Sequence, residues 1–158
     1  MTDERIIATL NELIAASKDG AQDFAVASKE VQEPEFARAF SDGEKTSQAA
    51  IAELQDQVRL LGGIAEQEGS MKAAAHRGWA NVKSMVRSRD DRAILEECER
   101  GEGHVRTRYA DALKLDLPEP IRALVERHHD AIVASHYRVL ELRNRLRDGG
   151  ARALRANG

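Results

Sequence analysis

The sequence contains one cysteine, three prolines and only 4% aromatic residues in 158. A single cysteine, Cys98, excludes an intramolecular disulfide. No run of about 18 apolar residues occurs, so a membrane-spanning helix is not expected. The first ten residues, MTDERIIATL, lack the basic and apolar regions of a secretion signal. Together these absences predict a soluble cytoplasmic protein with no membrane partner.

An excess of positive charge is also absent. The chain carries 24 basic and 27 acidic residues, a net charge of −3, which makes a nucleic-acid partner unlikely. One local exception is the segment from Arg143 to Gly158, with five arginines against one aspartate. Cations are favourable at a helix C-terminus, and this is the simpler interpretation. Loose binding of an anionic partner is the alternative.

Helical periodicity is the main positive signal. Apolar residues recur at steps of three, four or seven, which is typical of one buried helix face. Pro34 suits the first turn of a helix, and the LGG motif that ends at Gly63 predicts a helix stop. Cys98 falls on such a face and is interpreted as a small buried hydrophobe. The four expected helices run over Asp3–Val31, Pro34–Leu61, Asp91–Leu115 and Glu119–Asp148.

The connection between the second and third helices is too long for a tight turn. Met71–Val86 has helical composition, so we expect a short helix there, with Trp79 packing it onto the bundle. One long crossover is the ferritin-like variant of the four-helix bundle. The predicted fold is therefore all-α: a ferritin-like bundle over residues 3–148, with a helix-bearing crossover and a flexible tail at 149–158.

Each apolar stripe has a polar interruption near its middle. Midpoints of helices of similar length meet at one level in a bundle. The sequence therefore predicts a polar layer across the core, with apolar residues above and below it. Its members are Ser17, Ser47, Glu102 and Ser135, with His136 beside the last.

Ferritin-like di-metal proteins build their site from four glutamates, two of them followed by histidine three residues later. Only Glu126 and His129 have that spacing here, and both lie off the apolar stripe. A buried Glu102 must be paired or coordinated. The first interpretation gives it Ser47, Ser135 or His136 as a hydrogen-bonding partner and needs no cofactor. The second makes Glu102, His136 and Glu99 ligands of iron or zinc.

Three further side chains bear on this choice. Glu97 and Glu99 are expected on a water-facing side of the third helix, and His128 on the apolar stripe is interpreted as a core histidine. Gly101 and Gly103 flank Glu102, each at a cost of about 1 kcal/mol relative to alanine. We expect them to admit a neighbouring helix or water at the polar layer.

Five motifs between Ile7 and Arg143 carry a family resemblance. They are LNELIAASKDGAQDF, ELQDQVRLLGG, HRGWANVK, ECERGEGHVRTRYADAL and HYRVLELR. Together they resemble a family of uncharacterised bacterial four-helix-bundle proteins of ferritin-like fold. The resemblance implies a ferritin-like bundle and a link to stress responses, and it supplies no catalytic residue.

Two functions follow as hypotheses. One is a non-catalytic interaction protein, with a hydrogen-bonded polar layer in place of a full metal site; enzymatic activity is then not expected. The serines favour it, since hydroxyls bind iron poorly. The other is a metal-binding protein whose site around Glu102 and His136 is incomplete or shared between subunits. Amphipathic bundles often pair, so a homodimer is expected in either case.

Overall fold

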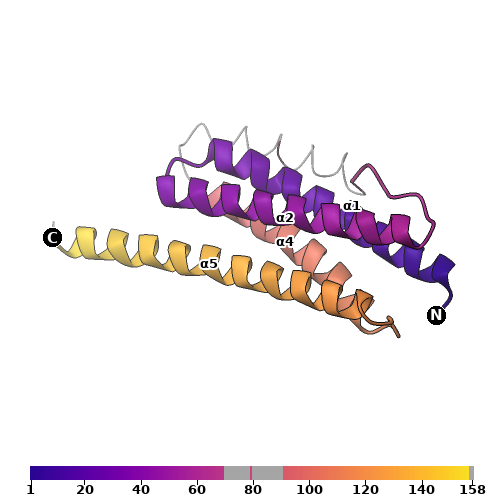
Figure 1. Cartoon of the computed structure of the whole chain (residues 1–158). Coiled ribbons are helices and arrows are strands. Elements are labelled where there is room, and N and C mark those ends of the chain that lie inside the picture. The colour runs from indigo at the N-terminus through magenta and orange to yellow at the C-terminus, as the bar shows by residue number, and fades with distance from the viewer. Residues whose placement is uncertain (70–78, 80–90, 157–158) are drawn as a thin grey trace.

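A computed structural model of the chain describes residues 1–69, 79 and 91–156. Four long helices occur among these residues: α1 (Asp3–Glu30), α2 (Pro34–Leu60), α4 (Asp91–Leu113) and α5 (Ile121–Ala156) (Figure 1). No strand occurs among these residues, so the all-α prediction is confirmed. The helices begin and end within two residues of the predicted bounds, except that α5 continues past Asp148 to Ala156. The predicted short helix over 71–86 lies outside the described residues, Trp79 excepted.

Local signals set the helix ends. The Thr2 hydroxyl accepts a hydrogen bond from the Arg5 amide at 3.3 Å and caps α1. Pro34 is the first residue of α2, where its missing N–H costs nothing. Gly62 adopts a φ of 82°, which favours glycine, and the LGG stop is confirmed.

Every pair of neighbouring helices is antiparallel. In each pair, residue numbers rise along one helix as those of their contacts fall along the other. Between α1 and α2 the contacts are Ile7–Gly63, just past the end of α2, and Phe24–Gly43, and between α1 and α4 they are Ser17–Tyr109 and Asp23–Gly101. Between α2 and α5 they are Asp42–Arg138 and Glu53–Arg127, and between α4 and α5 they are Glu99–Arg143 and Glu102–His136. α2 therefore ends beside the start of α1. Asp91 opens α4 at the other end, where its carboxylate accepts hydrogen bonds from the Gln32 and Glu33 amides. The connection between α2 and α4 thus leads from one end of the bundle to the other.

The buried apolar residues form two clusters, one toward each end of the bundle. The cluster at the start of α1 contains Leu10, Leu54 and Tyr109, and the other contains Phe24 and Phe40. This division agrees with the predicted apolar zones on either side of a polar layer. Trp79 belongs to the second cluster and is buried, as expected.

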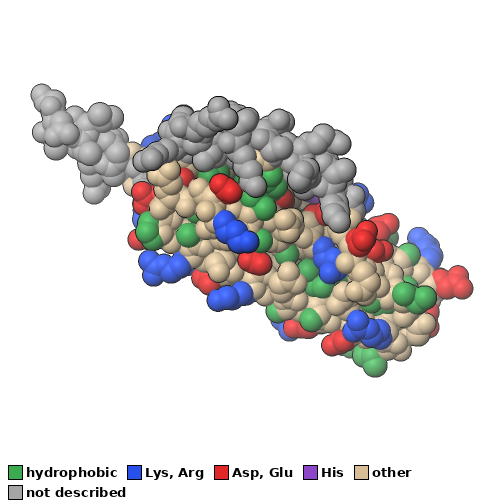
Figure 2. Space-filling view, turned by 90° about the horizontal axis from the view of Figure 1, so that it is seen from above, with side chains coloured by type: hydrophobic (Ala, Val, Ile, Leu, Met, Phe, Trp, Pro, Cys, Tyr) green, Lys and Arg blue, Asp and Glu red, His purple; other side chains and the backbone are tan. Residues whose placement is uncertain are grey.

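None of the described helices is long and apolar enough to span a membrane. Acidic and basic side chains are interspersed on the face shown in Figure 2. This mixture fits the small net charge of the sequence.

Candidate functional site

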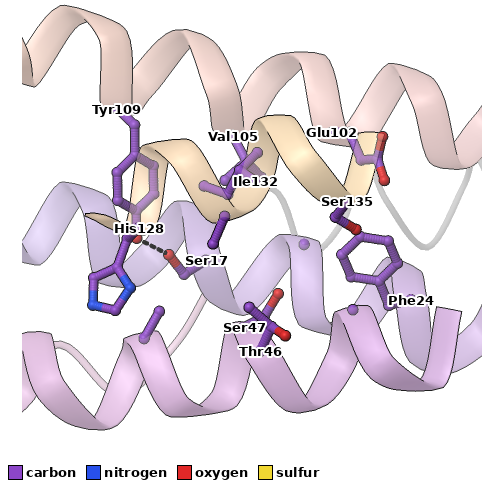
Figure 3. Close-up of a pocket in the computed structure, with 14 residues that line it drawn as sticks. Ser17, Phe24, Thr46, Ser47, Glu102, Val105, Tyr109, His128, Ile132 and Ser135 are labelled. Carbon is purple, nitrogen blue, oxygen red and sulfur yellow. Dashed lines mark hydrogen bonds between the residues drawn. The ribbon is translucent and has the colours of Figure 1, made fainter. Parts of the chain in front are cut away.

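A small cavity of about 40 Å³ lies between the four helices, where the two apolar clusters meet (Figure 3). All four helices contribute apolar residues to its walls, for example Phe24 from α1 and Val105 from α4. The walls also include every member of the predicted polar layer. The polar members are Ser17 from α1, Ser47 from α2, Glu102 from α4 and Ser135 from α5. The midpoint argument from sequence thus identified four side chains that share one cavity.

Glu102 is the one acid of the predicted layer, and it is buried, with 6% of its surface exposed. Its Oε2 forms a hydrogen bond with His136 Nδ1 at 2.9 Å, which joins α4 to α5. Burial raises the pKa of Glu102, and the bond to His136 offsets part of that rise. The other oxygen, Oε1, is buried and has no hydrogen-bond partner among the described residues. Of the three predicted partners, Ser47, Ser135 and His136, the structure shows a bond from Glu102 to His136.

Ser17 pairs with Tyr109 instead of with another serine. Their hydroxyls share a hydrogen bond of 2.7 Å between α1 and α4. Burial raises the pKa of Tyr109 to about 12, so the phenol stays neutral and can donate. Tyr109 lies on the predicted apolar stripe, but apolar periodicity carries no information about its hydroxyl group, and sequence reasoning missed this role.

His128 lies on the cavity wall and is buried, as its stripe position predicted. Burial lowers its pKa, so it is a neutral imidazole at pH 7. Its Nε2 lies 3.4 Å from Glu53 Oε2, yet it has no hydrogen-bond partner among the described residues. The histidine is therefore in the core but not fully satisfied there.

The prediction that Glu97 and Glu99 face water is wrong. Glu97 is 13% exposed and pairs with Arg100, one turn along α4. Glu99 is 24% exposed, and its Oε1 accepts a hydrogen bond from Arg143 Nη1 on α5 at 2.6 Å. Each carboxylate is ion-paired with an arginine, and the pair of Glu99 with α5 could not be read from periodicity along α4 alone.

Asp23 is a buried acid that sequence reasoning missed. It is 6% exposed, and its Oδ1 accepts a hydrogen bond from Trp79 Nε1 at 2.8 Å. Burial raises its pKa to about 6, although the bond to Trp79 acts in the opposite direction. A signal was present in the sequence, because Asp23 follows the buried Ala16 by seven residues and precedes Ala27 by four.

Gly101 lets this aspartate lie against α4. A Cβ atom at Gly101 would fall 2.0 Å from Asp23 Oδ2. At Gly103 a Cβ would meet nothing within 4 Å among the described residues. The expected close approach of a neighbouring helix is therefore confirmed for Gly101, whereas Gly103 faces open space among the described residues.

Cys98 is buried in the core, as predicted. Burial, with a contribution from the Glu102 and Asp23 carboxylates, raises its thiol pKa well above the ordinary value. A thiol in this state is protonated at neutral pH and is a poor nucleophile. Cys98 therefore serves packing.

The predicted ligands lie near one another but do not form a complete metal shell. Glu102 and His136 contact directly, while Glu99 pairs with Arg143. Among residues 1–69, 79 and 91–156, no group of three His, Cys, Asp or Glu side chains is arranged to hold an ion. Glu126 pairs with Arg122 on the surface, and His129 lies beside Asp130, so the Glu-x-x-His pair points away from the cavity.

Comparison with known proteins gives one family. The model described as a domain of unknown function, DUF2383, matches residues 5–115. This match spans α1, α2, the connection and α4, and it ends before α5. A search of curated proteins finds no match.

Proposed function

Since the chain belongs to the DUF2383 family, whose function is unknown, we propose that it is a non-catalytic, ferritin-like bundle that acts by binding protein chains, including its own copies. The antiparallel neighbours and the end-to-end connection between α2 and α4 support the ferritin-like part, since one long crossover defines that variant. A role in stress responses is the implication of the resemblance described above.

One observation carries the non-catalytic part of the proposal. Two of the polar side chains at the centre bond to polar neighbours inside the bundle, Ser17 to Tyr109 and Glu102 to His136. The cavity of about 40 Å³ has room for only a few water molecules. Sites for organic ligands are usually about 300 Å³ or larger.

A second candidate function, metal binding, is favoured by one atom. Glu102 Oε1 is buried without a partner among the described residues, and a cation would satisfy it. His136 would be the second ligand. Glu99 could join as a third ligand only by leaving Arg143. Alternatively, a residue of a second subunit could complete the ligand shell of an iron or zinc ion.

Elemental analysis discriminates the two proposals. Protein purified without chelator, with iron and zinc supplied, should contain far less than one metal ion per chain if the layer is structural. Glu102→Gln should then fold and self-associate like the parent, because the amide can still bond to His136. Stoichiometric metal that disappears in Glu102→Gln, while the fold persists, would overturn the non-catalytic proposal in favour of metal binding.

A further inference from the structure

The walls of the central cavity differ in their exposure to solvent. Every wall residue that comes from α1 or α4 is buried, whereas α2 and α5 contribute wall residues that solvent partly reaches. Thr46 of α2 is exposed, and Ser47 of α2 and Ser135 of α5 are half-buried. The approach from solvent to the cavity therefore lies between α2 and α5.

Glu102 brings an unsatisfied acceptor to this cavity. The side chain lines the cavity and is 6% exposed, and its Oε1 atom is buried without a hydrogen-bond partner among the described residues. A buried acceptor that stays unpaired costs free energy, and nearly all such atoms in native proteins have a partner. A hydrogen-bond donor that fits the cavity would remove this cost.

Two hydroxyl groups share the cavity with this oxygen. Figure 3 shows Glu102 and Ser135 toward one end of the cavity and Ser47 nearer its middle. Neither serine forms a hydrogen bond to another residue in the described part of the chain. Since a hydroxyl group donates one hydrogen bond and accepts two, both serines have capacity left for a small polar molecule. Three helices thus offer polar partners to one space.

Size and polarity together select water as that molecule. A bound water needs about 10–15 Å³ of such a volume and roughly two to four polar partners, so the cavity of about 40 Å³ holds about three. Cavities that stay empty are lined by apolar groups. A transition-metal ion is disfavoured, because no group of three His, Cys, Asp or Glu side chains is arranged to hold one among the described residues. Hydroxyl groups are also poor ligands for iron.

We propose that the central cavity binds a cluster of about three water molecules, one of which donates a hydrogen bond to Glu102 Oε1 while the others bridge to the Ser47 and Ser135 hydroxyls. The inference deepens the proposed function and rests on it, because water then completes the polar layer in place of a metal ion. It also explains why serines occupy the stripe positions of α2 and α5 at this level.

A crystal structure of the parent chain after treatment with chelator tests the site directly. Ordered water should lie about 2.5–3.0 Å from Glu102 Oε1, and water should lie within the same range of at least one of the two serine hydroxyls. Density at about 2.0–2.2 Å from Oε1 would identify a metal ion and would count against the proposed function as well. A metal-free cavity with no density beside Oε1 would overturn this inference alone.

Ser135→Val tests the same site in solution. Serine and valine have similar helix propensities, so the change mainly replaces a hydroxyl group by apolar volume. Valine should displace water and leave Glu102 Oε1 unpaired, so the folding equilibrium constant measured in urea should fall at least about fivefold. In a dry cavity the added volume would be favourable, and a constant that rises would overturn the inference. Ala134→Val, at the exposed neighbouring position of α5, is the matched control and should change the constant less.

A second background separates lost water from crowding. In a Glu102→Leu chain no carboxylate oxygen is left unpaired, so adding Ser135→Val should cost less than it does in the parent. An equal cost in both backgrounds would assign the loss to crowding and would overturn the inference. If circular dichroism shows that a variant misfolds, the crystal structure of the parent decides.

Discussion

The Ser17–Tyr109 hydroxyl pair is the best-defined single interaction in the polar layer. Tyr109→Phe keeps the ring but leaves the Ser17 hydroxyl buried with no partner. We expect the free energy of unfolding to fall by about 1–3 kcal/mol, the usual cost of an unsatisfied buried polar group. Urea denaturation measures this loss. Tyr137→Phe is the matched control, since Tyr137 is 65% exposed and its change should stay within about 0.5 kcal/mol.

The double variant Ser17→Ala/Tyr109→Phe shows whether the bond is the cause. Removing both hydroxyls leaves no unsatisfied group, so the double variant should lose less free energy than the two single losses added together. Strict additivity would mean that the two hydroxyls do not interact in solution.

Asp23 makes stability depend on pH in an unusual direction. Its pKa is about 6 in the folded protein against 3.8 as the ordinary value. The folded state therefore holds the proton more tightly, and the free energy of unfolding falls as pH rises from about 4 to about 6. Glu97, Arg100 and Asp19 also face this carboxylate and modify the midpoint. At 1.36 kcal/mol per pH unit, the full effect is at most about 3 kcal/mol.

Asp23→Asn removes that titration while its side-chain oxygen can still accept the Trp79 N–H bond. We expect the variant to be more stable than the parent above pH 6, with the difference vanishing below about pH 4. Chemical denaturation at several pH values measures the difference, and tryptophan fluorescence checks that Trp79 remains packed. A variant that follows the parent at every pH would show that Asp23 does not titrate in this range.

The same residue shows the limit of sequence reasoning at this scale. Polar residues were sought at helix midpoints, which identified Ser17 and Glu102 correctly. Asp23 lies nearly two turns after Ser17, at a position where its partner is Trp79 of the distant connection. Hydrophobic periodicity gives the buried face of a helix, but it does not give the residue that will lie opposite.

At the scale of helices, two glycines of α4 should respond oppositely to the same change. Alanine at an open helical position gains about 1 kcal/mol over glycine, so Gly103→Ala should stabilise the protein by that amount. Alanine at Gly101 would displace the Asp23 carboxylate, which is buried and bonded to Trp79. We expect Gly101→Ala to destabilise despite the same helix-propensity gain. Thermal unfolding compares the pair, and equal shifts of the melting temperature would contradict the contact with Asp23.

Helix ends were predictable where a specific residue sets them and not otherwise. Thr2, Pro34 and Gly62 each serve a backbone need at a helix terminus, and all three ends were predicted within one residue. The last helix was expected to end at Asp148, with a flexible tail after it, yet α5 continues through Gly149 and Gly150 to Ala156. Two glycines cost about 2 kcal/mol of propensity, and the good helix formers that follow can offset this.

For the whole molecule, the class and the number of long helices followed from four periodic segments and short loops. The contacts across the bundle did not follow. Arg143 was interpreted through its position near a helix end, but in the structure it spans to Glu99 and joins two helices. Sequence spacing fixes neighbours along one helix, while partners on other helices depend on how the helices rotate and shift against each other.

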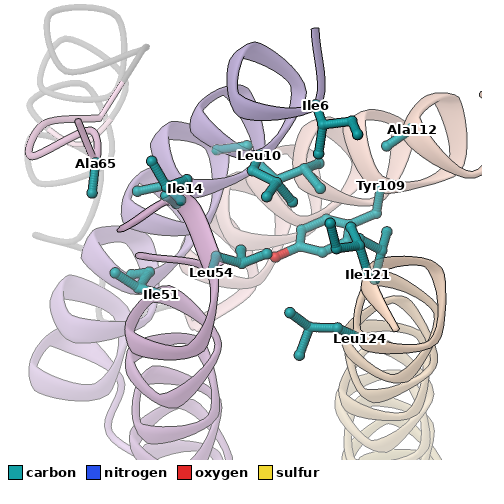
Figure 4. Packing of buried hydrophobic residues seen from close by; sticks show 14 of the residues in the cluster. Ile6, Leu10, Ile14, Ile51, Leu54, Ala65, Tyr109, Ala112, Ile121 and Leu124 are labelled. Carbon is teal, nitrogen blue, oxygen red and sulfur yellow. The ribbon is translucent and has the colours of Figure 1, made fainter. Parts of the chain in front are cut away.

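The family match ends at residue 115, before α5 begins. It therefore has to be asked whether the other helices can fold without α5. Ile121 and Leu124 of α5 pack with Leu54 and Tyr109 in the cluster shown in Figure 4. Among the side chains of α5 whose burial is described, four aliphatic ones are buried, and each contributes about 1.5–3 kcal/mol, which together approach the whole stability of a domain. These side chains are Ile121, Leu124, Val125 and Val139.

A chain that ends at residue 115 should therefore lose cooperative unfolding and bind the dye ANS, because its core cluster is uncovered. A chain that ends at residue 148 is the matched control and should keep both the cooperative transition and a dye-free surface, since it retains all four of those side chains. Circular dichroism and dye fluorescence make the comparison. A stable, dye-free 1–115 chain would show that α1, α2 and α4 form a complete domain by themselves, with α5 as an accessory helix.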